Sequence, residues 1–127
     1  MKQATGPAVA SYARDARFEP DDTIRSWLRF RDLGVSQATG GKFHAYVTRA
    51  AELGKSTGWH YHKFDFQLIF CLKGWVKMLY EGGQEVTLRP GDSVYQPPGV
   101  VHNLVDYSED MEILEIESPH GIVTVDV

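Results

Sequence analysis

A chain of 127 residues with 43% hydrophobic and 24% charged residues has the composition of one soluble globular domain. Its formal net charge of −4 comes without a basic cluster, which argues against a nucleic-acid partner. No apolar stretch approaches the roughly 20 residues that span a bilayer. The amino terminus lacks the apolar core of a secretory signal, and Cys71, the only cysteine, cannot form an intrachain disulfide. We therefore expect a cytoplasmic protein with neither a nucleic-acid nor a membrane partner.

Residues 1–22 are expected to form an amino-terminal arm, because they show no strong period and prolines bound any short helix within them. From residue 23 to residue 127, short apolar segments alternate with turn signals, which is typical of an all-β sandwich or barrel. The predicted strands are residues 24–30, 42–52, 67–73, 75–80, 85–88, a segment between Asp92 and Pro97, and residues 104–107, 112–117 and 122–127. The nearly continuous apolar run in residues 67–73 predicts a strand that is buried on both faces.

Two histidines, His60 and His62, are separated by one residue. Residues two apart in a strand point to the same face, so these side chains should project side by side. Neutral imidazole is a common ligand of iron, nickel, copper and zinc. The pair therefore predicts a chelate for a divalent metal ion.

Two spaced motifs surround this pair. The first motif consists of Gly54, His60, His62, Gln67 and Gly74. Five residues separate its first glycine from the His-X-His pair, four separate the pair from the glutamine, and six separate the glutamine from the last glycine. The second motif consists of Gly91, Pro97, Gly99 and His102. Five residues separate its first glycine from the Pro-X-Gly segment, and two separate that segment from the histidine. With sixteen residues between the motifs, the chain resembles a small single-domain cupin.

The resemblance implies a double-stranded β-helix, a conical jelly-roll barrel, with one divalent transition metal (Fe, Ni, Mn or Zn) in its mouth. Carried over to this chain, the metal ligands would be the imidazoles of His60, His62 and His102 and the side-chain oxygen of Gln67. A neutral amide replaces the usual carboxylate at Gln67, so a bound metal should be held less tightly and act as a stronger Lewis acid. Cupins with three histidines and a glutamine include one that converts unsaturated uronates to their keto forms.

This resemblance implies isomerase or lyase chemistry on an oxygen-rich small molecule, such as a sugar acid or a keto-enol. Two alternatives stay open, an iron-dependent dioxygenase of the quercetinase or diketone type and a small-molecule-binding cupin without catalysis. The family also implies a homodimer, for which residues 68–72 and the segment containing Trp27 and Phe30 could supply apolar surface.

Glu115 and Glu117 alternate with Leu114 and Ile116 late in the chain. The simple interpretation directs both glutamates toward solvent or an interface. The alternative directs this strand into a polar barrel mouth, where Glu115 would act as a catalytic acid or base. Three other side chains could line the same cavity or simply pack: His44, Tyr46 and Thr48. Cys71 has the parity of Gln67 and is expected to be a small buried hydrophobic residue.

Overall fold

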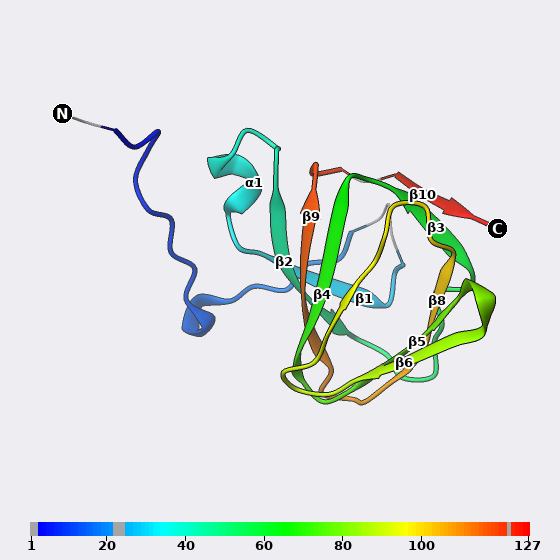
Figure 1. Cartoon of the computed structure of the whole chain (residues 1–127). Coiled ribbons are helices and arrows are strands. Elements are labelled where there is room, and N and C mark those ends of the chain that lie inside the picture. Colours follow the sequence, from blue (N-terminus) through cyan, green and yellow to red (C-terminus); the bar gives the residue numbers. More distant parts are fainter. Residues whose placement is uncertain (1–2, 22–24, 122) are drawn as a thin grey trace.

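The computed structural model describes residues 3–21, 25–121 and 123–127, and these residues form two antiparallel sheets of five strands each (Figure 1). The first sheet has the order β1 (Leu28–Asp32), β2 (His44–Ala50), β9 (Glu112–Ser118), β4 (Phe66–Lys73) and β7 (Ser93–Tyr95). The second has the order β10 (Val123–Asp126), β3 (His60–Lys63), β8 (His102–Tyr107), β5 (Val76–Tyr80) and β6 (Gln84–Leu88). The predicted all-β class is confirmed.

Helical structure in the described residues is limited to three short elements: η1 (Ala13–Asp15), α1 (Val35–Ala38) and η2 (Glu81–Gly83). The helix α1, which follows β1, was not predicted from the sequence. Its start is fixed locally, because the carboxylate of Asp32 accepts a hydrogen bond from the backbone N–H of Gly34 at 2.7 Å. No helix in this part of the chain is long and apolar enough to cross a membrane.

The amino-terminal segment begins away from the barrel, passes through the η1 turn and then runs toward β1 (Figure 1). It joins the barrel where Glu19 and Phe30 form an isolated antiparallel bridge and where the guanidinium of Arg49 lies 3.8 Å from the ring centre of Phe18. The predicted boundary between arm and barrel, at residues 22 and 23, falls outside the described residues, as do the first residues of the predicted strands 24–30 and 122–127.

The two sheets enclose an apolar core, and β4 shows how the sequence alternation builds it. Ile69 and Cys71 point inward and are 2% and 0% exposed, whereas Phe66 and Leu72 point outward and are 40% exposed each. The prediction that this strand is buried on both faces is therefore wrong for its outer face. The expectation for Cys71 is confirmed, because its side chain lies in the core.

Trp27 also belongs to the core, where its ring stacks on that of Tyr107 with 5.3 Å between ring centres. Phe30 packs against the same core and meets the ring of Tyr46 edge-on at 5.8 Å. Full burial of an aromatic side chain stabilises the folded state by about 2–3 kcal/mol. Trp27 is thus buried in the core of its own chain, whereas Phe30 is only partly buried, and their predicted use as a surface between subunits stays a prediction.

Candidate metal centre

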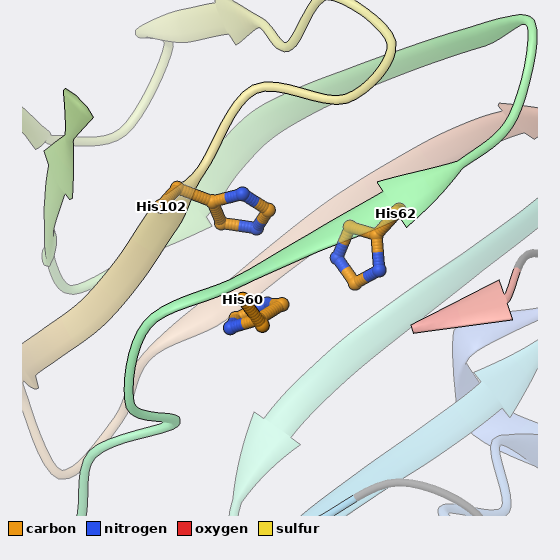
Figure 2. Close-up of side chains that lie close together, drawn as sticks. All are labelled: His60, His62 and His102. Atoms are coloured by element: carbon orange, nitrogen blue, oxygen red, sulfur yellow. The ribbon is translucent and has the colours of Figure 1, made fainter. Parts of the chain in front are cut away.

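Three histidines from neighbouring strands of the second sheet point toward one another (Figure 2). His60 and His62 lie on β3, and His102 lies on β8 directly opposite His60. The ring centres are 4.2 Å apart for His60 and His102, 4.8 Å for His60 and His62, and 4.9 Å for His62 and His102. One nitrogen atom from each ring lies within 4.8 Å of the others, so this cluster could bind a metal ion.

The hydrogen bonds of the three rings leave one nitrogen of each ring available. Nδ1 of His60 donates to the carbonyl oxygen of Gly58 at 2.8 Å, and Nδ1 of His102 donates to that of Val100 at 3.0 Å. Nδ1 of His62 is hydrogen-bonded to Oγ1 of Thr124 at 2.9 Å. Because a carbonyl can only accept, the first two rings carry their proton on Nδ1 and present an Nε2 lone pair. This is how metal-binding histidines are oriented in proteins.

Glycines in the two motifs shape the backbone around these rings. Gly58 has a φ of 73°, a left-handed conformation that favours glycine, and its carbonyl holds the His60 ring. Gly99 has a φ of 79°, and its N–H donates to the backbone oxygen of His62 at 3.2 Å. The loop that leads to His102 is thereby tied directly to the strand that carries the other two histidines.

The histidines are neutral at physiological pH. Burial lowers the pKa of His62 to about 3, with the neighbouring rings of His102 and His60 contributing further. Burial also lowers the pKa of His102 to about 4, and it lowers the pKa of His60. A metal ligand must be unprotonated, so this cluster of neutral imidazoles fits a divalent transition metal.

The histidines line a cavity of about 1010 Å³ in the barrel. Its wall includes the three side chains that the sequence suggested as possible lining residues, His44, Tyr46 and Thr48. The ring of His44 stacks between that of Tyr46, at 4.6 Å, and that of His120, at 4.1 Å. The cavity therefore has a polar and aromatic wall opposite the histidine cluster.

Gln67, the fourth predicted ligand, lies in the same cavity wall and is 2% exposed. Its Oε1 accepts a hydrogen bond from Nε2 of Gln96 at 2.7 Å, and Oε1 of Gln96 accepts one from the hydroxyl of Tyr80 at 2.7 Å. Its Nε2 donates to Oε1 of Glu115 at 3.3 Å. The amide is thus fixed in orientation, with its oxygen and nitrogen distinguished by their partners.

The interpretation that Glu115 and Glu117 face solvent is wrong. In the register between β4 and β9, Glu115 lies opposite Ile69 and Glu117 opposite Gln67, and both partners point inward. Both glutamates line the cavity, and Glu117 is only 3% exposed. Leu114 occupies the outer face of the sheet instead, and the inner face of this strand changes from apolar at Ile113 to polar at the two glutamates.

Two hydroxyl groups hold these carboxyl groups. Oγ1 of Thr48 donates to Glu115 at 2.5 Å, and the hydroxyl of Tyr46 donates to Glu117 at 3.2 Å. Burial raises the pKa of Glu115 to about 7, against the hydrogen bonds from Thr48 and Tyr46. Burial, with the nearby charge of Glu115, also raises the pKa of Glu117 to about 7. Both carboxyl groups are therefore able to take up or release a proton near neutral pH.

Comparison with known proteins settles the family. A family model described as a cupin domain matches residues 49–117, more than half of the chain. The chain belongs to the cupin family. The resemblance inferred from the two motifs is confirmed, and the double-stranded barrel is the jelly roll of that family.

This cupin is similar in sequence to a curated enzyme and shares its fold with several solved structures. Over 73 residues the chain is 32% identical to quercetin 2,3-dioxygenase of Bacillus subtilis, a match that covers 58% of this chain and 21% of that enzyme. The chain thus spans about a fifth of that relative's length. KdgF from a Halomonas species has the same fold, with a TM-score of 0.70 and 17% identity over 87% of this chain and 94% of that one. The polyketide cyclase RemF of Streptomyces resistomycificus has it too, with a TM-score of 0.72 and 16% identity over 100% of this chain and 87% of that one.

Sequence reasoning missed two residues of the site, Gln96 and Arg25, and gave no role to Glu117. Gln96 precedes two prolines and gives no local signal, since its role depends on Gln67 across the sheet. Glu117 could have been recognised from strand parity with Glu115 once that strand was directed inward. Arg25 lines the cavity from the segment before β1, where no periodic pattern indicates direction.

Proposed function

We propose that this cupin is a metal-dependent enzyme that acts on an oxygen-rich small molecule by isomerase or lyase chemistry. The observation that carries the proposal is the arrangement of three neutral imidazoles around one point of a cavity that two carboxyl groups also line. His60, His62 and His102 would hold one divalent transition metal, with iron, nickel, manganese and zinc as candidates. When bound, such an ion supplies Lewis-acid polarisation of a substrate oxygen.

Gln67 is proposed as the fourth ligand. A carbonyl oxygen has two lone pairs, and the hydrogen bond from Gln96 uses one of them. The other lone pair remains for the metal. Because Nε2 of the same amide donates to Glu115, Gln67 would connect the metal centre with the carboxyl group beside it.

Glu115 is proposed as the acid or base. A group whose pKa lies near the working pH is best suited to give and take a proton, and the pKa of Glu115 is about 7. Thr48 and Gln67 each hold one carboxyl oxygen of Glu115, which fixes the group in the cavity wall. Removing a proton from a bound substrate is the step that isomerisation, tautomerisation and many eliminations share.

A second candidate function is an iron-dependent dioxygenase, favoured by the similarity to the quercetin dioxygenase of Bacillus subtilis. The two functions differ in their need for oxygen. We therefore suggest loading the protein in turn with Fe(II), Ni(II), Mn(II) and Zn(II) and supplying sugar acids, diketones and flavonoids with and without dioxygen. Product formed without oxygen supports the isomerase or lyase, and oxygen consumed in step with substrate supports the dioxygenase. Tight binding without turnover in any combination would contradict both and leave a binding protein.

We also propose a homodimer that uses the outer face of the first sheet. Phe66, Leu72 and Tyr95 are 40%, 40% and 51% exposed on β4 and β7, and Phe66 and Tyr95 pack together with 5.8 Å between ring centres. Apolar side chains grouped on one face are typical of protein interfaces. Light scattering should give a dimer for the wild-type protein and a monomer for Leu72→Glu; a monomeric wild type would contradict the proposal.

A further inference from the structure

The guanidinium group of Arg25 lies in the cavity wall beside the candidate metal centre. Its Nε and Nη2 donate to the backbone oxygen of Thr57 at 3.1 and 2.7 Å, and Nη2 also donates to Oδ1 of Asp126 at 2.7 Å. Both anchors are close to His60, because Asp126 is its partner in the register of β10 and β3 and Thr57 precedes it by three residues. The side chain is thereby held next to the histidines.

This anchoring leaves two of the five N–H groups of the guanidinium without a partner among the described residues. A guanidinium has five N–H groups, and the contacts to Thr57 and Asp126 engage the one on Nε and the two on Nη2. The two N–H groups of Nη1 have no hydrogen-bond partner among the described residues. An arginine that is already held in place loses little further side-chain entropy when it binds an anion, and its planar group suits a carboxylate.

Arg25 supplies a positive charge on the histidine side of a cavity that the carboxyl groups of Glu115 and Glu117 also line. The proposed ligands, three imidazoles and one amide, are all neutral, so a divalent ion bound there would keep its full charge. Arg25 adds a positive charge within electrostatic reach of the rings. After burial, its charge is one of the contributions that lower the pKa of His60 and of His62. Asp126 offsets that charge from one side, leaving the Nη1 side of the group without an acidic partner in the described residues.

We propose that Arg25 is a substrate-binding residue and that the substrate is a small organic acid. Its carboxylate would pair with Nη1 of Arg25, while a hydroxyl or carbonyl oxygen of the same molecule faces the three histidines. This inference rests on the proposed function and narrows its substrate class from oxygen-rich molecules to acids. The competing explanation is a structural one, in which Arg25 and Asp126 only fasten the segment before β1 to β10.

The test compares acids with neutral molecules of the same shape. Protein loaded with Ni(II), and assayed for metal content, is titrated calorimetrically with two matched pairs, glycolate against glycolamide and galacturonate against galactose. We expect the wild type to prefer the acid in at least one pair. Arg25→Gln should reduce that preference at least tenfold while the nickel content stays unchanged. Arg29→Gln is the control, because Arg29 lies outside the cavity wall and donates to the backbone oxygens of Ser26 and Leu28.

A further variant distinguishes a substrate-binding role of Arg25 from a purely structural one. Asp126→Asn breaks the ion pair but keeps the guanidinium, so the preference for the acid should be retained or should increase. If Asp126→Asn loses the preference as Arg25→Gln does, or if Arg25→Gln leaves it unchanged in both pairs, the proposal is overturned. A wild-type protein that holds nickel but shows no preference in either pair overturns it as well. Failure of the wild type to take up any metal would instead overturn the proposed function, and this inference with it.

Discussion

Replacing Glu117 by glutamine should remove a pH-dependent loss of stability from the metal-free protein. Glu117 is 3% exposed, and its pKa in the folded protein is about 7, against 4.5 for an ordinary glutamate. The folded state therefore holds this proton more tightly than the unfolded state does. It follows that the contribution of Glu117 to the free energy of unfolding decreases as the pH rises from 4.5 to about 7 and then levels off. The difference between the two pKa values corresponds to about 3 kcal/mol.

The measurement is urea unfolding of chelator-treated wild type and Glu117→Gln between about pH 5 and about pH 8. Glutamine keeps an acceptor for the Tyr46 hydroxyl, so the variant should fold. Every other titrating group is present in both proteins, so their difference in unfolding free energy reports on Glu117 together with its charge interaction with Glu115. That difference should grow by about 2.5 kcal/mol in favour of the variant over this pH range. The exposed Glu109→Gln serves as control, and a difference for Glu117→Gln that stays constant across this range would refute the reasoning.

Three further predictions concern the metal centre and its carboxyl group. His62→Ala should lose its metal during dialysis against a chelator, whereas Gln67→Ala should retain part of it, as measured by elemental analysis. Equal loss of metal from both variants would mean that the amide contributes as much to metal affinity as an imidazole. Glu115→Gln should keep its metal and lower any turnover found by about 10²-fold or more, because general acid–base catalysis contributes that much; unchanged turnover would exclude a catalytic role. Relative to His102→Gln, the metal-free wild type should lose stability as the pH falls from 6.5 toward 4, because an unfolded histidine takes up its proton near 6.5 but folded His102 does so only near 4. A difference in unfolding free energy between the two proteins that stays constant over this interval in urea unfolding would contradict the burial of a neutral imidazole at this position.

The sequence predicted the features that depend on local spacing. The two-residue period of a strand was sufficient to place His60 and His62 side by side, and the second motif identified His102 as their companion. Turn signals were sufficient for most strands, because glycine and proline act within a few residues. These inferences hold since the spacing itself determines the geometry.

Features that depend on pairing between distant strands were not predictable. The direction of Glu115 and Glu117 follows from their register against β4, and the alternation with Leu114 suggested the opposite face. The outer face of this sheet carries apolar residues, while its inner face is polar where it lines the cavity. The usual expectation that apolar residues point inward therefore fails at Glu115 and Glu117. Gln96 and Arg25 likewise have roles only through partners 29 and 32 residues away in the chain.

The central claim is that the imidazoles of His60, His62 and His102 share one cation. The most direct measurement is elemental analysis of protein purified without added metal, followed by titration of the chelator-treated protein with Fe(II), Ni(II) and Zn(II). We predict about one divalent ion per chain for the wild type and none for His60→Ala or His102→Ala, with all three proteins folded. A folded wild-type protein that contains no metal and takes up none of these ions would contradict the account.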